Sequence, residues 1–189
     1  MRIHGNKTIK RRIIKDDRKY SEYRKELEED FFGLCGYCGK NQYYFYEPFH
    51  IDHFAPKSIF KTRIDDYSNL VLSCPQCNRH KSNKWVTDDA YISIKENEGF
   101  IDPATEEYDN HLHRDEKGNI IADTDIGNYM YNAFKFNIRP TGMIWKINRL
   151  RELKEILKND KSEKGRELYQ KIDIQLESLL TDMIFINKE

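Results

Sequence analysis

The sequence lacks any hydrophobic run of the roughly 18 residues that a helix needs to cross a membrane. Its opening stretch, MRIHGNKTIKRRIIKDD, also lacks the apolar segment of a secretory signal, so we expect a cytoplasmic protein without membrane contact. Internal repeats and low-complexity tracts are missing as well. The 189 residues are enough for one domain with a hydrophobic core, or for a small module with a helical appendage.

Net charge is also missing, because 32 Lys and Arg residues balance 32 Asp and Glu residues. The overall charge therefore says nothing about a polyanionic partner. The distribution is uneven, however. Residues 1–25 hold ten basic and three acidic residues, whereas residues 86–125 hold three basic and twelve acidic ones. This pattern predicts a basic face and an acidic face, and ordinary solvated surface charge is the alternative.

Cysteine is scarce, and all four cysteines fall into two Cys-x-x-Cys pairs, Cys35 with Cys38 and Cys74 with Cys77. In a reducing compartment disulfides are disfavoured, and two such pairs suit one tetrahedral zinc ion with four thiolate ligands. A redox dithiol and four unrelated cysteines are the alternatives. Because four cysteines leave no open coordination position, we expect this zinc to be structural.

Hydrophobic spacing predicts mixed secondary structure in the first half of the chain. A helix is expected over residues 18–31, and Gly33 ends it. Short strands are expected around Tyr43–Tyr46 and near Phe49–His53, with a helix after Cys77.

The second half is loop-rich at residues 86–123, with a small hairpin around the turn DEKG, and residues 124–137 are expected to be helical. Two longer helices follow, with Asp160 and Ser162 between them as candidate caps. Their apolar stripes consist of Ile144, Ile147, Leu150, Leu153 and Leu157, and of Leu168, Ile172, Leu176, Leu179 and Met183. We interpret the stripes as core between packed helices, and a partner surface is the alternative.

The stretch HIDH at residues 50–53 places metal-binding and acid–base side chains together. Cleavage of a phosphodiester bond needs a base to deprotonate water, a divalent cation, and cationic groups that hold the backbone. His53 suits the base, because the ordinary pKa of histidine lies near neutrality. Asp52 is a hard oxygen ligand for magnesium or manganese. Since neighbours on a strand point to opposite faces, the two can share a site only where the strand ends or bends.

Two asparagines further along the chain are candidates for the rest of this site. Asn78 follows directly after Cys77, so the zinc would fix its position, and it is a candidate second metal ligand. Asn69 would orient the loop that carries His53 by hydrogen bonds to the backbone. Turn or cap chemistry is the alternative for both asparagines.

The stretches HIDHFAPKS and YSNLVLSCPQCNRHKSNK resemble the HNH endonuclease family, also called the ββα-metal or His-Me finger fold. The resemblance covers about residues 33–85, where a DH pair, an NL dipeptide, CPQCN and a nearby lysine occur in order. It implies an α+β fold in which a four-cysteine zinc site cross-links a ββα-metal core. An N-terminal helix and a C-terminal helical extension complete the expected architecture.

By this resemblance, His53 is the general base and Asp52 is a ligand of the catalytic metal. Asn69 is the structural asparagine of the motif, and Asn78 is the second metal ligand at a position where many members have histidine. Asparagine there favours Mg²⁺ or Mn²⁺ over zinc or nickel. Products with 5′-phosphate and 3′-hydroxyl ends are expected.

Basic side chains around the motif are expected to contact nucleic acid. They are His50, Lys57, Arg79, His80, Lys81 and Lys84. Such phosphate contacts position the substrate without reading its sequence. A metal ligand or simple packing is the alternative for His50, and ordinary surface charge for the lysines and Arg79. His111 and His113 lie in an acidic stretch, and we interpret them as structural or interfacial.

Four regions are therefore predicted. They are a basic N-terminal segment and helix at 1–32, the nuclease core with zinc knuckles at 33–85, an acidic loop-rich segment at 86–123 and a helical region at 124–189. The predicted function is hydrolysis of phosphodiester bonds in DNA, with double-stranded DNA as the expected substrate. The alternatives are a zinc-knuckle protein that binds nucleic acid without cutting it, and a zinc adaptor whose acidic segment docks a partner.

Compact stand-alone members of the family with a similar layout often belong to bacterial anti-phage or restriction systems. They work there beside an ATPase or sensor subunit, and the resemblance implies that the C-terminal helices dock such a partner. A homo-oligomer would turn a single nick into a double-strand break, and the sequence leaves the oligomeric state open.

Overall fold

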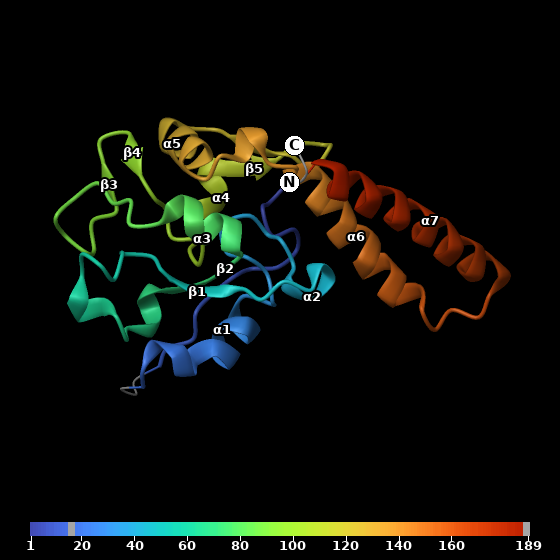
Figure 1. Ribbon diagram of the computed structural model, residues 1–189, viewed down its shortest axis with the longest axis horizontal. Helices are drawn as coiled ribbons and strands as arrows, with labels where there is room; N and C mark the ends of the chain where they lie inside the picture. Colours follow the sequence, from blue (N-terminus) through green and yellow to red (C-terminus); the bar gives the residue numbers. More distant parts are fainter. Residues whose placement is uncertain (15–17, 187–189) are drawn as a thin grey trace.

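In the computed structural model, which describes residues 1–14 and 18–186, a β-hairpin followed by a helix lies at the centre of the molecule (Figure 1). The strands β1 (His50–His53) and β2 (Leu70–Ser73) pair antiparallel, with Asp52 opposite Val71 and His53 opposite Leu70. The helix α3 (Pro75–Lys81) begins directly after β2, because proline suits a first helical turn. This β-hairpin and helix, with the cysteine cluster beside them, confirm the predicted α+β fold.

The helix predicted over residues 18–31 is present in two pieces, the 3₁₀ turn η1 (Tyr20–Tyr23) and α1 (Arg24–Asp30). Gly33 has a φ of 65°, and its N–H donates to the carbonyl of Glu28 at 2.8 Å. This left-handed conformation is the usual way for glycine to end a helix, so the predicted stop is confirmed.

The strand predicted around Tyr43–Tyr46 is wrong, because these residues belong to the helical turn α2 (Gln42–Phe45) and its end. The side-chain oxygen of Asn41 accepts hydrogen bonds from the backbone N–H groups of Tyr43 and Tyr44, at 2.9 and 3.4 Å. Tyr46 then adopts a left-handed φ of 49°. The aromatic residues favour a strand, but the asparagine cap determines the local structure.

The middle of the chain consists of short elements, as its composition predicts. They are η2 (Lys61–Arg63), η3 (Tyr67–Asn69), β3 (Ile94–Lys95), β4 (Glu98–Gly99), α4 (Tyr108–His111), β5 (Leu112–Arg114) and β6 (Ile120–Ala122). Strands β5 and β6 pair on either side of the DEKG turn, which confirms the predicted hairpin. The helix predicted at 124–137 is α5 (Asp125–Ala133), followed by η4 (Phe136–Ile138).

Two long helices, α6 (Thr141–Leu157) and α7 (Glu163–Ile186), form a hairpin that projects to one side of the other elements (Figure 1). Their apolar stripes meet around Ile147, Ile172 and Leu176, which confirms that most stripe residues form core. The hydroxyl of Ser162 accepts the N–H of Gly165 at 3.0 Å, as expected of a cap. No helix among the described residues is long and apolar enough to span a membrane.

The basic N-terminal segment packs against the acidic part of the chain. Its arginines reach across, with Arg2 at 2.7 Å from Asp109 and Arg11 at 2.7 Å from Asp102. Ile3 is fully buried, and its N–H donates to Asp109 at 3.2 Å. At these positions the opposite charges therefore pair with each other within the fold instead of forming two separate faces.

Candidate active site and zinc site

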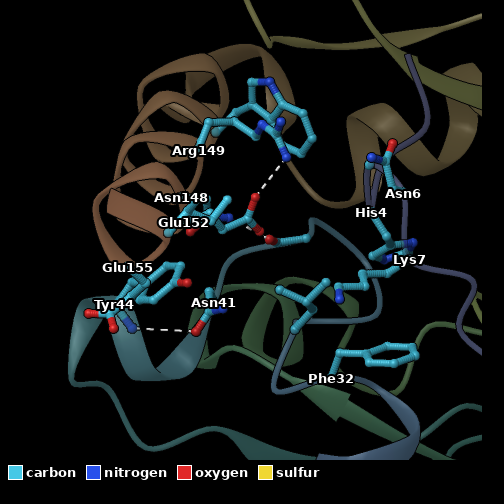
Figure 2. Close-up of a pocket in the computed structure, with 15 residues that line it drawn as sticks. His4, Asn6, Lys7, Phe32, Asn41, Tyr44, Asn148, Arg149, Glu152 and Glu155 are labelled. Carbon is cyan, nitrogen blue, oxygen red and sulfur yellow. Dashed lines mark hydrogen bonds and ion pairs between the residues drawn. The ribbon is translucent and has the colours of Figure 1, made fainter. Parts of the chain in front are cut away.

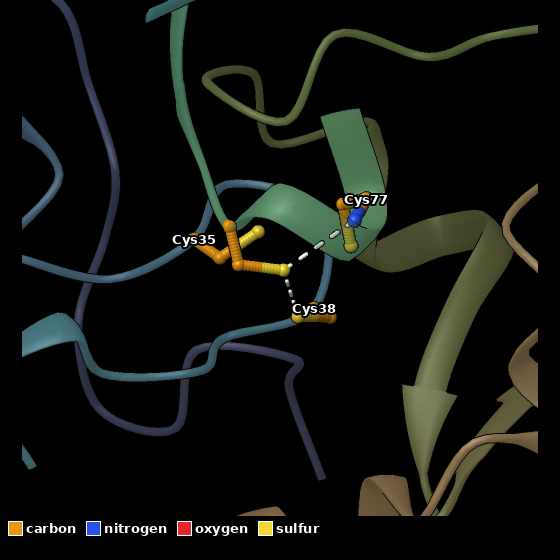
Figure 3. Close-up of side chains that lie close together, drawn as sticks. Cys35, Cys38 and Cys77 are labelled. Carbon is orange, nitrogen blue, oxygen red and sulfur yellow. Dashed lines mark hydrogen bonds between the residues drawn. The ribbon is translucent and has the colours of Figure 1, made fainter. Parts of the chain in front are cut away.

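The two Cys-x-x-Cys pairs meet beside the central hairpin (Figure 3). All four sulfur atoms are buried and lie within 4.8 Å of one another. The sulfurs of Cys38 and Cys74 are 3.8 Å apart. A tetrahedral zinc ion with zinc–sulfur bonds of about 2.3 Å has sulfur–sulfur edges of about 3.8 Å. The four cysteines therefore fit the predicted structural zinc.

Local backbone geometry brings these sulfurs together. In the first pair, Gly39 has a left-handed φ of 66° and donates its N–H to the carbonyl of Cys35 at 2.8 Å. Gly36 donates to the carbonyl of Leu72 at 2.8 Å, which ties this knuckle to β2. The second pair occupies the start of α3, where Cys74 is the N-cap residue. A helix N-terminus favours anionic sulfur, which is the form that binds zinc.

The end of β1 opens into a cavity of about 440 Å³. The strand ends at His53, so Asp52 and His53 both line this cavity although they are neighbours in sequence. The other lining residues are Ile51, Pro56, Lys57, Ser58, Asn78, Arg79, Ser82 and Asn83. The structure thus brings together five residues that the sequence analysis selected: Asp52, His53, Lys57, Asn78 and Arg79.

The imidazole of His53 is held through one of its nitrogens. Its Nε2 lies 2.9 Å from the carbonyl oxygen of Ile64, which can only accept, so Nε2 carries the hydrogen. The ring of Tyr20 meets the imidazole edge-on at 4.8 Å between centroids. Burial lowers the pKa of His53 below its ordinary value. The neutral ring is therefore favoured, and its Nδ1 is left to accept a proton.

The carboxylate of Asp52 is buried between two donors. The hydroxyl of Tyr37 donates to it at 2.7 Å, and the ammonium of Lys81 lies 3.8 Å away. Burial raises the pKa of Asp52, although Lys81 and Tyr37 act in the opposite direction. A carboxylate held in this way is preoriented for a hard metal ion at the cavity.

Lys81 is fully buried, with an exposed fraction of 0%, so the predicted phosphate contact is wrong for this residue. Its ammonium donates to the carbonyl of His53 at 2.9 Å and lies about equally far from the rings of Phe54 and Phe100, at 6.0 and 5.8 Å. The inward face of α3 carries Lys81 into the core below Asp52. Burial lowers the pKa of Lys81, and the Asp52 carboxylate opposes this change.

Asn69 ties together the loop between the two strands. Its side-chain oxygen accepts the N–H of Ala55 at 2.7 Å, and its side-chain nitrogen donates to the carbonyls of Ala55 and Arg63 at 3.0 and 3.1 Å. The side chain is fully buried. These bonds fix the chain at Ala55, two residues after His53, and at Arg63, next to the Ile64 carbonyl that contacts the His53 ring.

Asn78 faces β1 from α3. Its amide nitrogen lies 2.8 Å from Nδ1 of His50, so the amide donates to that ring nitrogen. The amide oxygen of Asn78 remains available as a hard ligand. Asp52 and Asn78, the two ligand candidates selected from the sequence, thus both line the cavity with oxygen donors suited to Mg²⁺ or Mn²⁺.

The other selected side chains lie outside this cavity. His80 is half-buried, and the ammonium of Lys84 donates to its carbonyl. His111 bridges Thr124 and Glu107, at 2.6 and 2.9 Å. His113 bonds to Asp123 at 2.5 Å, so both histidines contact neighbouring side chains of the fold, as a structural role requires.

Three residues near the two sites were not selected from the sequence. Tyr37 lies between Cys35 and Cys38, and this position in the sequence could have indicated that it lies near the zinc site. Tyr20 gives no such signal, since it comes from the distant N-terminal helix. Arg139 gives none either, yet its guanidinium contacts the sulfur of Cys77 at 3.2 Å.

Residues 35–84 match a family model described as HNH endonuclease. The matched segment begins at the first zinc-knuckle cysteine and includes Asp52, His53, Asn69 and Asn78. No match was found among the curated proteins or among the solved structures.

Proposed function

We propose that this chain is a metal-dependent endonuclease built on residues 35–84, the segment that matches the HNH endonuclease model, which describes a family of phosphodiester hydrolases that act on DNA. The observation that carries the proposal is one cavity lined by a base candidate, His53, and by two oxygen ligands, Asp52 and Asn78. A protein that only binds DNA has no use for a carboxylate beside the phosphate, because like charges repel.

His53 acts as the general base in this proposal. Its Nε2–H is bonded to Ile64, so Nδ1 is the atom that takes the proton from water. The pKa of His53 is lowered by burial, which keeps the ring neutral and ready to accept this proton at physiological pH. The hydroxide formed attacks phosphorus, the P–O3′ bond breaks, and the leaving 3′ oxygen takes a proton from solvent. The expected products therefore have 5′-phosphate and 3′-hydroxyl ends.

Asp52 and Asn78 hold the divalent cation through their carboxylate and amide oxygens. When bound, Mg²⁺ or Mn²⁺ stabilises the negative charge that develops on the phosphate oxygens. Lys57 and Arg79 are exposed at the cavity and neutralise the flanking phosphates. Asn69 keeps the loop of His53 in place.

The test is cleavage of supercoiled plasmid with Mg²⁺ or Mn²⁺, comparing the wild type with His53→Ala. We expect metal-dependent nicking that is lost in His53→Ala and kept in His113→Ala, whose imidazole lies outside the cavity. Nicking that persists in His53→Ala contradicts the assignment of the base. Binding of DNA by the wild type without cleavage under both metals would instead favour a binding module.

We also propose that this nuclease is the effector of a bacterial anti-phage or restriction system, restrained by an ATPase or sensor protein. Exposed apolar side chains on the projecting hairpin support a docking role, with Ile156 75% and Ile174 71% exposed. The test counts phage plaques on cells that express the chain with its genomic neighbours. Ile156→Glu with Ile174→Glu should abolish protection while the purified nuclease keeps its activity, and unchanged protection contradicts the docking role.

A further inference from the structure

Arg139 is a buried cation that the proposed reaction does not use. It follows η4 and precedes α6, and only 8% of the residue is exposed. Its Nη1 lies 3.2 Å from the sulfur of Cys77. Its Nη2 lies 3.7 Å from the sulfur of Cys38 and 3.8 Å from that of Cys74. One guanidinium thus contacts three sulfurs of the zinc site.

The surroundings of this guanidinium hold it in place without neutralising its charge. Nη1 also donates to the carbonyl of Phe134 at 3.2 Å, and the guanidinium lies 5.2 Å from the ring centroid of Phe136. Within residues 1–14 and 18–186, no carboxylate forms an ion pair with Arg139. A buried charge is costly unless an opposite charge compensates it. The sulfur cluster is the compensating group that contacts it.

The charge of the zinc site is complementary to this arginine. Zinc supplies two positive charges and four thiolates supply four negative ones, so the occupied site is a buried dianion. N–H donors directed at the sulfurs disperse this charge, and donors of this kind tune metal sites. Arg139 supplies such donors to sulfurs from both Cys-x-x-Cys pairs.

A second contact joins the same part of the chain to the first knuckle. Asn148 of α6 donates its side-chain nitrogen to the carbonyl of Gly39 at 2.8 Å. Figure 2 shows Asn148 on α6, facing a cavity of about 570 Å³ that α6 shares with α2 and the N-terminal segment. The beginning of the helical hairpin therefore contacts the zinc knuckles at the sulfurs and at the backbone.

We propose that Arg139 is an outer-shell residue of the zinc site, and that through it the zinc ion fixes the base of the C-terminal helices to the nuclease domain. Coupling of this kind is reciprocal. Loss of the arginine weakens zinc retention, and loss of the zinc loosens residues 134–148. Neither effect depends on the proposed cleavage of DNA.

The first test measures the rate of zinc release from the purified full chain to a chromogenic chelator. We expect Arg139→Met to release zinc about 10–100-fold faster than the wild type, because loss of an outer-shell partner typically weakens metal affinity by that factor. Arg139→Lys keeps the positive charge but loses the planar set of N–H donors. Its rate of zinc release should therefore lie between those of the wild type and Arg139→Met. The matched control is Arg149→Met, because Arg149 is an exposed α6 residue that pairs with Glu152. Equal release rates for Arg139→Met and the wild type overturn the proposal.

The second test uses cobalt(II) in place of zinc, because its sulfur-to-metal charge-transfer bands report the electron density on the thiolates. Loss of N–H donors makes the sulfurs richer in electrons, so these bands should move to lower energy in Arg139→Met and not in Arg149→Met. Unchanged bands overturn the proposal, since a merely structural role does not move them. If Arg139→Met fails to fold, Arg139→Lys serves for both measurements.

The third test is hydrogen exchange followed by mass spectrometry. Removal of zinc from the wild type should speed exchange in residues 134–148 beyond any change in α7. In Arg139→Met these residues should already exchange quickly with zinc bound. If the exchange rates of residues 134–148 change neither on removal of zinc nor in Arg139→Met, zinc does not fix the base of the C-terminal helices, and the proposal is overturned.

Discussion

The hydroxyl of Tyr37 donates a hydrogen bond of 2.7 Å to the carboxylate of Asp52. Tyr37 lies between Cys35 and Cys38 in the first zinc knuckle, and Asp52 lies on β1 at the cavity. A zinc ion bound by the four cysteines would therefore fix the position of a carboxylate proposed to hold the catalytic metal. This bond is a direct connection between the two sites.

Tyr37→Phe removes that hydrogen bond and leaves the carboxylate of Asp52 less well oriented. We expect the Mn²⁺ concentration for half-maximal cleavage to rise about 10-fold, because orienting partners of a metal ligand typically contribute that much. The free energy of unfolding should fall by about 1–3 kcal/mol. A titration of plasmid cleavage with Mn²⁺ measures the first effect, and Tyr43→Phe at an exposed tyrosine is the control. An unchanged metal requirement contradicts the connection.

Substitution by methionine should lower stability at Lys81 and weaken DNA binding at Lys57. Lys81→Met leaves Asp52 buried without its cation, so unfolding should become easier by about 3–5 kcal/mol. Lys57→Met, at an exposed residue, should change stability by less than about 0.5 kcal/mol. It should instead weaken DNA binding and reduce the salt dependence by about one unit of slope.

Urea unfolding and salt-dependent DNA binding measure these effects, the latter in a His53→Ala background to prevent cleavage. A loss of stability in Lys57→Met equal to that in Lys81→Met would contradict the difference in burial.

Zinc removal should unfold the nuclease core. One zinc ion per chain is expected, bound by the four buried sulfurs, and Cys74→Ser should purify without it. Because Cys74 also starts α3, this variant should lose helical circular dichroism and melt at a lower temperature. Metal analysis with thiol titration checks the stoichiometry. Four freely reactive thiols in a folded wild-type protein would rule out the zinc site.

His4 should make stability depend on pH. Burial lowers its pKa to about 4 from an ordinary value of 6.5. The unfolded chain binds the proton more readily, so the contribution of neutral His4 is complete above pH 6.5 and is lost as the pH falls toward 4. The loss amounts to about 3 kcal/mol.

His4→Gln provides the comparison, because its amide can still donate to the carbonyl of Gly36, which lies 2.7 Å from Nε2 of His4. Urea unfolding at pH 7 and pH 4.5 should show a steeper loss for the wild type than for His4→Gln. Parallel losses would show that His4 does not carry the effect.

Short-range patterns predicted much of the fold and of the candidate site. The Cys-x-x-Cys spacing and the strand ending at His53 are near-local features, since a few residues of backbone settle them. The helix expected after Cys77 begins earlier, at Pro75, and includes that cysteine, because Cys74 caps its first turn and proline suits the first helical position. The strand expected around Tyr43–Tyr46 was wrong because the Asn41 cap outweighed the strand preference of the tyrosines. Lys81 was misassigned because charge in a sequence does not reveal which face of a helix turns inward.

The sequence by itself determined the cysteine pairs and the grouping of Asp52 and His53, because neighbouring residues remain neighbours in any fold. The second strand of the hairpin, Leu70–Ser73, was implied only by the family resemblance. Only the tertiary structure decided that Tyr37 contacts Asp52, that Lys81 lies beneath it, and that Arg139 reaches the sulfur of Cys77, 62 residues away in the chain. Such contacts depend on how separate elements pack and on where burial makes one charge require another. That requirement arises in three dimensions and leaves no periodicity or motif in the sequence.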